Sequence, residues 1–484
     1  MNKQIRRLGV SMLVLFGALF LQLNVVQVLQ AQDYSDKPGN TRAVVRDYSR
    51  PRGQIVSADG TVLARSVEVE GTDKRERQYP EHDLFAHVTG YFSLRYNKDG
   101  VERTYNEELA GRGGIENAGN VVDLLLDDDH SRDVHLTIQR SVQQAAKDAL
   151  GDKPGAVVAI DPRDGSILAL WSFPSFDPEA ISQLNDDASE RGWGLLNADP
   201  RKPLLPRTFR ESYFPGSTFK VVTASAGLAS GAVTPEQPVF PTQNEYVPPQ
   251  TRTPIHNFGN STCGGALFEI LRVSCNISFA EMGVLIGAEA LVGTARDFGF
   301  DDRAPIDLPA VALSAIDDPD FFEQNIPLLA QTAIGQQVRS TPLQMAMVAA
   351  AIANGGEVMK PHVMADIRDR DGEVTRSWHP EVWRRAISGE IATILRDAMV
   401  GVVRDGTAGG LQVPGVTTAG KTGTAQLGNG TSHAWIIGFA PAEAPRVAIA
   451  VIVEAQPGAS EQTGGRVAAP IGRAVLEAAL AVVQ

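Results

Sequence analysis

The feature that most constrains the fold of this 484-residue chain is an apolar run from Leu8 to about Leu29. About 20 consecutive apolar residues are enough to cross a bilayer as a helix. Three basic residues precede the run, and positive charge before a span favours an N-terminus on the cytoplasmic side. We therefore expect a short cytoplasmic tail at 1–7, a single-pass transmembrane anchor at 8–30, and a remainder outside the inner (cytoplasmic) membrane.

Two other interpretations of this run stay open. A cleaved signal peptide is one, because Gln22, Asn24 and Gln27 weaken the apolar character of its C-terminal half. The length of the run and the lack of a clear small-residue cleavage site argue against cleavage. A helix buried in a protein core is the other alternative. Of the three, the uncleaved anchor fits the pattern best.

Composition excludes some classes of protein. The chain carries 57 acidic and 44 basic residues, for a formal net charge of −13. Binding of nucleic acid needs clustered Lys and Arg to neutralise phosphates, so no nucleic-acid partner is expected. Hydrophobic residues make up 43% and charged residues 21%, which is typical of a folded globular protein. The length predicts two or three domains.

The two cysteines, Cys263 and Cys275, stand twelve residues apart. In an oxidising compartment outside the membrane such a pair can form a disulfide, and we favour that interpretation over two buried free thiols. Without neighbouring histidines the pair makes a poor zinc site, and no metal is expected. A thiol nucleophile at Cys275 is disfavoured for the same reason, since no histidine lies nearby in the sequence.

The sequence after the anchor divides into two parts. Two short β-type runs flank an Ala-Asp-Gly turn within 52–64 and predict a hairpin. That hairpin belongs to a small N-terminal domain, which we place at 31–133. From about residue 134 the pattern changes, and residues 134–484 form a second, larger domain.

The larger domain is predicted to mix strands and helices. Apolar runs at 155–160 and 166–171 flank an Asp-Pro-Arg-Asp-Gly turn, which is typical of a hairpin. Composition and spacing predict further elements, namely helices at 137–150, 217–230, 340–354 and 468–483 and strands at 416–426, 434–440 and 446–454. Strands at both ends with helices between them predict an α+β fold, with one antiparallel sheet covered by helices.

A Ser-x-x-Lys motif stands at Ser217 and Lys220, directly after a Phe-Pro-Gly sequence that marks a helix start. Residues three apart share one helix face, so the two side chains are expected to be neighbours. A serine hydroxyl becomes a strong nucleophile when a nearby base, such as a desolvated neutral lysine, removes its proton. Backbone N–H groups at the helix start favour the negative charge that would develop on an acyl oxygen.

Two further motifs follow. Ser274 and Asn276 can project together from a loop and present a hydroxyl and an amide on one wall. Lys421, Thr422, Gly423 and Thr424 lie in a strand-like run, where a glycine allows close approach of a substrate and an exposed edge can pair with an extended peptide.

Each of the three motifs alone is common and is usually a solvated helix face, a polar loop or a strand end. Each occurs once in this chain, and they follow one another in a fixed order. Together they resemble the Ser-x-x-Lys, Ser-x-Asn and Lys-Thr-Gly signature shared by penicillin-binding proteins and serine β-lactamases. Cys275 stands where β-lactamases usually carry Asp, which favours a penicillin-binding protein.

The resemblance covers the chain from about residue 50 to its end. The segments around the first and third motifs, 214–220 and 419–426, look like the corresponding family segments, as do 334–336, 341–346 and 353–356 between the second and third motifs. Residues 52–64 and 102–111 resemble the non-catalytic, dimerisation-like domain of class B members. The likeness is greatest to the penicillin-binding protein A subgroup, and it implies the penicillin-binding/β-lactamase-like fold for the larger domain.

The resemblance also implies an activity, that of a serine D,D-transpeptidase that cross-links peptidoglycan. Ser217 would attack the penultimate D-Ala carbonyl of a stem peptide, with Lys220 as general base. Ser274 would carry the proton to the departing D-Ala, helped by the positive field of Lys421. The backbone N–H groups of Ser217 and Thr424 would form the oxyanion hole.

Substrate binding is implied for the remaining motif residues. Asn276 would position the stem peptide, while Thr422 and Thr424 would hold its terminal carboxylate, with Gly423 between them. β-Lactams would acylate the same serine, and no cofactor would be needed. Expected partners are stem peptides ending in D-Ala-D-Ala, the membrane, a membrane glycan polymerase, and proteins of the division or elongation machinery.

Other functions use the same motifs. A D,D-carboxypeptidase, a β-lactam sensor or a lactamase would let water rather than an amine attack the acyl-enzyme. A non-catalytic cell-wall scaffold would keep the fold for interactions, although three intact motifs argue against it. His433 and Trp435, after the third motif, could border the cleft in a catalytic or stacking role, or could be strand residues packed by their neighbours; neither is assigned to the site.

Overall fold

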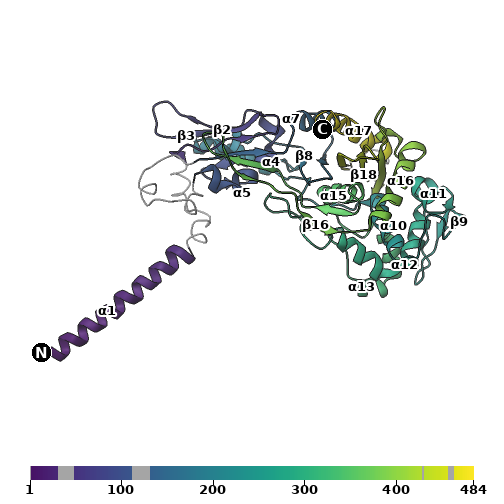
Figure 1. The fold of residues 1–484 in the computed structure, drawn as a ribbon, viewed down its shortest axis with the longest axis horizontal. Helices are drawn as coiled ribbons and strands as arrows, with labels where there is room; N and C mark the ends of the chain where they lie inside the picture. The colour runs from purple at the N-terminus through teal and green to yellow at the C-terminus, as the bar shows by residue number, and fades with distance from the viewer. Residues whose placement is uncertain (1, 31–47, 112–130, 428–429, 456–462, 484) are drawn as a thin grey trace.

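The computed structural model describes residues 2–30, 48–111, 131–427, 430–455 and 463–483, and it shows one long helix standing apart from an elongated folded body (Figure 1). The beginning of the predicted N-terminal domain, 31–47, and the segment 112–130 lie outside these described residues. The long helix is α1 (Asn2–Asn24), which continues into the π-helical turn η1 (Val25–Leu29).

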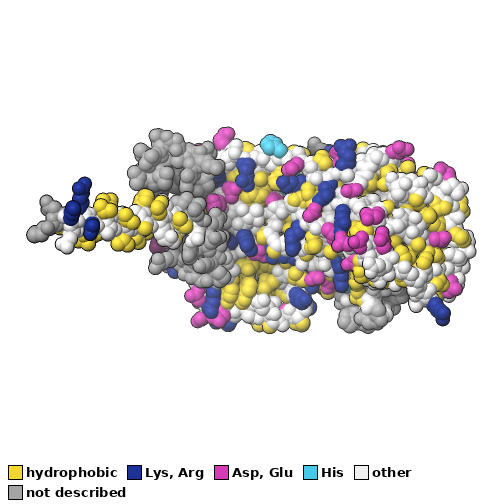
Figure 2. All heavy atoms as spheres, turned by 90° about the horizontal axis from the view of Figure 1, so that it is seen from below, with side chains coloured by type: hydrophobic (Ala, Val, Ile, Leu, Met, Phe, Trp, Pro, Cys, Tyr) yellow, Lys and Arg dark blue, Asp and Glu magenta, His cyan; other side chains and the backbone are white. Residues whose placement is uncertain are grey.

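Helix α1 is long and apolar enough to cross a membrane. The most apolar 18-residue window of its segment Lys3–Gln27 has a mean hydropathy of 2.0, and none of that window is buried against the rest of the chain. Figure 2 shows hydrophobic side chains along this helix and basic side chains gathered towards its N-terminal end. A second helix, Asn276–Asp297, is also long and apolar, but 56% of it is buried, as in the core helix of a folded domain.

The N-terminal part is built on a six-stranded sheet. The predicted hairpin is present, since Ile55 pairs with Ala64 in antiparallel register. In spatial order the strands are β15 (Val374–Ser377), β14 (Met364–Arg368), β6 (Asp133–Leu136), β1 (Ile55–Val56), β2 (Val62–Glu68) and β3 (Arg75–Gln78). Strands from 364–377 therefore complete a sheet that begins at residue 55, and the two predicted domains share it.

Short elements and a buried charge cluster complete this part. Glu102 is fully buried, and its carboxylate accepts hydrogen bonds from Arg52 Nε at 2.7 Å and from Arg77 Nε at 2.6 Å. Burial alone would raise the pKa of Glu102, but the two guanidinium groups hold it below its usual value. The short elements are η2 (His82–Leu84), α4 (Ala86–Thr89), β4 (Phe92–Ser93), β5 (Asn97–Lys98), α5 (Gly100–Thr104) and α6 (Asn106–Leu109).

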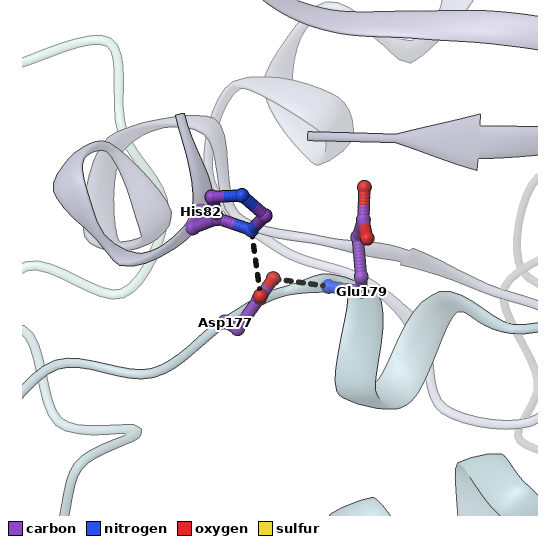
Figure 3. Close-up of side chains that lie close together, drawn as sticks. All are labelled: His82, Asp177 and Glu179. Atoms are coloured by element: carbon purple, nitrogen blue, oxygen red, sulfur yellow. Dashed lines mark hydrogen bonds and ion pairs between the residues drawn. The ribbon is translucent and has the colours of Figure 1, made fainter. Parts of the chain in front are cut away.

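A polar contact joins the N-terminal part to the larger domain. His82 Nδ1 lies 2.9 Å from Asp177 Oδ2, and Asp177 Oδ1 accepts a hydrogen bond from the backbone N–H of Glu179 at 3.0 Å (Figure 3). Glu179 Oε1 accepts a hydrogen bond from the backbone N–H of Tyr79 at 3.0 Å. The hydrogen bond from His82 to Asp177 raises the pKa of the imidazole. Both carboxylates already have partners within the chain, so we describe the group as an interdomain contact.

The larger domain is organised on a five-stranded antiparallel sheet. Its spatial order is β17 (Ala419–Gln426), β18 (Ser432–Ala440), β19 (Val447–Val453), β7 (Gly155–Ile160) and β8 (Ile167–Phe173). The predicted hairpin forms β7 and β8, and the three predicted C-terminal strands form β17 to β19. Strand β17, which carries the third motif, lies at an edge of the sheet.

Helices cover both faces of this sheet, as predicted. Helix α15 (Pro342–Ala353) packs on one face, and α7 (Arg140–Leu150) and α17 (Ala469–Leu480) pack together on the other. Helix α7 begins three residues later than predicted. The reason is that 133–136 form strand β6 and the N–H of Thr137 donates to the carbonyl of Val363, which extends the sheet contact.

Among the remaining elements, the helices that carry the first two motifs lie to the right of strands β8 and β18 in Figure 1. The remaining helices are α8 (Glu179–Ser182), α9 (Asp186–Ala198), η3 (Gly216–Phe219), α10 (Lys220–Ala229), η4 (Phe258–Asn260), α11 (Leu267–Arg272), α12 (Asn276–Asp297), α13 (Pro319–Glu323), α14 (Ile326–Thr332), α16 (Gly389–Asp405), η5 (Gly409–Leu411) and η6 (Gly464–Ala468). The strands are β9 (Phe240–Gln243), β10 (Glu245–Tyr246), β11 (Ile255–His256), β12 (Cys263–Gly265), β13 (Glu357–Met359) and β16 (Val382–Arg385).

Candidate active site

Ser217 lies in the 3₁₀ turn η3, and Lys220 is the first residue of α10. The turn packs directly against strand β17. A Cβ atom built on Gly423 would lie 2.8 Å from the carbonyl oxygen of Pro215 and 2.9 Å from a methyl of Thr218. Glycine at 423 is thus needed for the serine turn to reach the strand, in addition to the approach of substrate that the sequence suggested.

The second motif occupies the junction between α11 and α12. Ser274 has a φ of 58°, in the left-handed region that non-glycine residues rarely adopt, and α12 begins at Asn276. This sharp turn lets the Ser274 hydroxyl and the Asn276 amide face the start of α10. Both are within hydrogen-bond distance of the Lys220 amine.

The amine of Lys220 is fully buried among oxygen atoms. Its Nζ lies 2.7 Å from the carbonyl oxygen of Ser274, 2.7 Å from Asn276 Oδ1 and 3.3 Å from Ser274 Oγ. A carbonyl and an amide oxygen only accept hydrogen bonds, so they take two N–H groups of the amine. A neutral lysine would then have its lone pair left to accept a proton from a hydroxyl.

The amine of Lys421 approaches the same serine from strand β17. Its Nζ lies 2.7 Å from Ser274 Oγ and 2.9 Å from the carbonyl oxygen of Thr422, and the side chain is fully buried. The Ser274 hydroxyl is therefore within hydrogen-bond distance of both lysines.

Burial lowers the pKa of both lysine amines. It lowers the pKa of Lys421 to about 7. For Lys220, burial and then repulsion by Lys421 hold the pKa well below the usual lysine value. Burial and the neighbouring charge therefore both favour the neutral form of the Lys220 amine, which is the form that can accept a proton.

All eight predicted site residues converge on one cleft. A cavity of about 1230 Å³ is lined by Ser217, Ser274, Asn276, Thr422, Gly423 and Thr424, and the two lysines lie directly behind its wall. The Ser217 hydroxyl is partly exposed to this cleft and bonds to no other described residue. Such a hydroxyl is free to meet a substrate, and catalytic hydrogen bonds are often long before substrate binds.

The sequence did not reveal the role of Asn257. Its side chain is buried, and its Oδ1 accepts from the backbone N–H of Asn276 at 2.9 Å and of Ile277 at 3.2 Å. This oxygen caps the N-terminus of α12 from a distant part of the chain. The Asn276 amide in turn donates to the carbonyl of His256 at 3.1 Å. An isolated Asn in a loop gives no sequence signal of such a role.

Cys263 and Cys275 form a disulfide with a Cα–Cα separation of 5.8 Å. Because Cys275 is the central residue of the second motif, the bridge ties that motif to strand β12 on the wall of the cleft. A bridged sulfur is no thiol nucleophile. The segment 255–263 thus holds the second motif by a disulfide, a helix cap and a backbone contact.

His433 and Trp435 are packing residues, which decides between the two interpretations that the sequence left open. The ring of His433 accepts from the N–H of Ala455 at 3.0 Å and lies edge-on to Tyr213. The buried indole of Trp435 donates to the carbonyl of Phe214 at 3.1 Å, just before the serine turn. Neither side chain lines the cleft.

Comparison with known proteins gives two family matches. Residues 155–477 match the penicillin binding protein transpeptidase domain, and residues 52–132 match the penicillin binding protein A dimerisation domain. Two curated relatives are named peptidoglycan D,D-transpeptidase PbpA. The relative from Mycobacterium tuberculosis is 38% identical over 502 residues and the one from Mycolicibacterium smegmatis is 38% identical over 495, each alignment covering 99% of both chains.

Solved structures show the same similarity. The ceftriaxone acyl-enzyme complex of penicillin-binding protein A from M. tuberculosis superimposes with a TM-score of 0.83 at 38% identity, covering 90% of this chain and 100% of that one. A D,D-transpeptidase domain from Eggerthella lenta superimposes with a TM-score of 0.78 at 33% identity, covering 90% of this chain and 99% of the other.

We predict that Asn257→Ala slows acylation of the protein by fluorescent penicillin and lowers its melting temperature. Loss of a helix cap costs typically about 1 kcal/mol, and if that energy is lost at the second motif the rate should fall roughly fivefold. Asn257→Asp keeps the acceptor oxygen and should retain most of the rate. Asn197→Ala, on the exposed face of α9, is the matched control. An unchanged rate in Asn257→Ala would contradict the role of this cap.

We predict that the second-order rate of penicillin acylation falls as pH rises through about 7. A lysine loses its charge above its pKa, so the positive field of Lys421 disappears in that range. The test is the acylation rate between about pH 5 and pH 9. Lys421→Arg stays charged throughout, so its residual rate should lack this decline. A wild-type rate that rises through pH 7 and stays high would show that the charged form is not required.

Proposed function

Because this chain belongs to the penicillin-binding protein transpeptidase family, as a class B member of the penicillin-binding protein A subgroup, we propose that it forms peptide cross-links in peptidoglycan as a D,D-transpeptidase. One observation above all supports this activity. The Ser274 hydroxyl is within hydrogen-bond distance of two buried lysine amines, in a cleft that the Ser217 hydroxyl also lines.

In the first half of the proposed reaction, Ser217 Oγ attacks the carbonyl carbon of the penultimate D-Ala. The neutral amine of Lys220 takes the serine proton. As the peptide bond breaks, Ser274 gives its hydroxyl proton to the departing nitrogen of the terminal D-Ala and receives one from the Lys220 ammonium. The products are free D-Ala and an ester between Ser217 and the stem peptide.

In the second half, the amine of a neighbouring stem peptide attacks the ester carbonyl. The new amide bond is the cross-link, and Ser217 regains its proton through the same relay. Neither half requires a cofactor, because serine acyl transfer proceeds through a covalent intermediate with proton transfers alone. A β-lactam enters the first half as a carbonyl substrate, and its acyl-enzyme remains on the serine.

In this proposal, backbone and side-chain hydrogen-bond donors stabilise the negative charge of the oxyanion and of the substrate carboxylate. The N–H groups of Ser217 and Thr424 form the oxyanion hole, a feature whose donors typically contribute about 2.7–4 kcal/mol each. The hydroxyls of Thr422 and Thr424 hold the terminal carboxylate, and Asn276 positions the peptide. Edge strand β17 can pair with an extended stem peptide, since its outer side bonds to no other strand of the described sheet.

The orientation in the cell is part of the same proposal. With the apolar part of α1 in the inner membrane and the basic residues at its N-terminal end in the cytoplasm, the cleft faces the peptidoglycan. Glycan strands then come from a membrane polymerase of the division or elongation machinery. The apolar exposed surface of α1 supports the membrane placement.

We predict that fluorescent penicillin labels Ser217 and no other residue of the detergent-solubilised protein. Ser217→Ala should abolish labelling because it removes the nucleophile, whereas Ser230→Ala, directly after the C-terminal end of α10, should label at the wild-type rate. The labelled residue is identified by digestion and mass spectrometry. Label at another position, or none in the wild-type protein, would refute the proposed chemistry.

A second prediction separates transpeptidation from hydrolysis. Acyl-enzyme formed on a stem-peptide donor should partition mainly to an amine when a stem-peptide acceptor is present, and the cross-linked product should exceed the hydrolysed donor. Product ratios are read by mass spectrometry at increasing acceptor concentration. Hydrolysis that does not change with acceptor would favour the carboxypeptidase or sensor alternative. Absence of both products in protein that binds penicillin normally would favour a sensor.

A further inference from the structure

A threonine outside the three motifs contacts the proposed carboxylate site. Thr407 follows α16, and its Oγ1 lies 2.7 Å from the Oγ1 of Thr422, the central residue of the third motif. Both residues line the cleft. The contact joins two hydroxyls, each of which can donate one hydrogen bond and accept others.

The backbone holds Thr407 firmly at this place. The guanidinium of Arg272, at the end of α11, donates to the carbonyl of Asp405 at 2.8 Å, and the N–H of Thr407 donates to the carbonyl of Arg272 at 3.4 Å. A Cβ on Gly406 would lie 2.4 Å from the Arg272 oxygen, so this close approach requires glycine. Thr407 therefore links the end of α11, two residues before Ser274, to strand β17.

The direction of the hydrogen bond follows from what Thr422 must do. A substrate carboxylate only accepts hydrogen bonds. If Thr422 gives its single hydroxyl proton to that carboxylate, it has none left for Thr407. Thr407 must then be the donor and Thr422 the acceptor in the bound state.

We propose that Thr407 is a positioning residue for recognition of the acyl donor's terminal carboxylate, an inference that rests on the proposed transpeptidase function. By donating to Thr422, it turns the Thr422 hydroxyl towards the cleft. A donor chain of two hydroxyls also strengthens the outer hydrogen bond, because each bond polarises the next. The contribution appears only when the acyl donor carries a negative terminal group.

The test uses two acyl donors that differ at one group. Both are thioester analogues of the stem peptide, one with a terminal carboxylate and one with a terminal carboxamide, and thiol release by the full-length protein in detergent gives kcat/KM. Thr407→Val keeps the shape of the side chain but removes the donor. Thr407→Ser keeps the hydroxyl. Thr393→Val, on the exposed face of α16, is the control.

We predict that Thr407→Val lowers kcat/KM for the carboxylate donor roughly three- to tenfold, the size of one hydrogen bond, and changes the carboxamide donor less than twofold. Thr407→Ser should remain close to wild type with both donors. Equal losses on both donors would indicate a merely structural role and overturn the proposal, as would an unchanged rate with the carboxylate donor.

The same measurements distinguish failure of this proposal from failure of the proposed function. If the wild-type protein releases thiol from neither donor and Ser217 takes no penicillin label, the transpeptidase function itself fails, and the role of Thr407 fails with it. If the wild-type protein is active and Thr407→Val does not discriminate between the donors, only the role of Thr407 is overturned.

Discussion

The structure of the cleft depends on placing two lysine amines around one serine hydroxyl away from water. Burial penalises the charged form of each, and the repulsion between them penalises a second charge further. A solvated lysine would hold its proton at neutral pH and could not accept one from a serine. The price of burying amines is offset by the oxygen atoms that face Lys220 and by the contact of Lys421 with Ser274. Burial of the two amines thus costs free energy of folding and also makes the site reactive.

Three separate segments must stay in register for this arrangement to persist. Gly423 lets the serine turn lie against β17, so the first and third motifs share one contact. The second motif is held differently, by the disulfide and by Asn257 from the segment 255–263. Thr407 then links Arg272, two residues before the second motif, to Thr422 of the third motif. Each of these supports is short, and none depends on a long flexible side chain.

Much of this could be read from the sequence. The hairpins at 55–64 and 155–171 were predictable because turn residues and alternating β-formers are local signals. The convergence of the motifs was predictable only through resemblance, since no local signal joins positions 217 and 421. Asn257 and Thr407 were missed because their partners lie 19 and 15 residues away and their chemistry is that of ordinary loop residues. Pairing of 133–136 in the sheet moves the start of α7 to a later residue than predicted, a tertiary effect that helix propensity alone does not predict.

The N-terminal sheet has a consequence for biosynthesis. Its strand β6 lies between β1, which comes early in the chain, and β14, which begins at Met364. A ribosome has therefore made more than two thirds of the polypeptide before the last strands of this sheet exist. Until then β6 presents an unpaired edge, which is a risk for aggregation in any nascent chain. The N-terminal sheet begins early in the chain but can be completed only after β14 and β15 have been made. Folding of the N-terminal part is therefore coupled to synthesis of the larger domain.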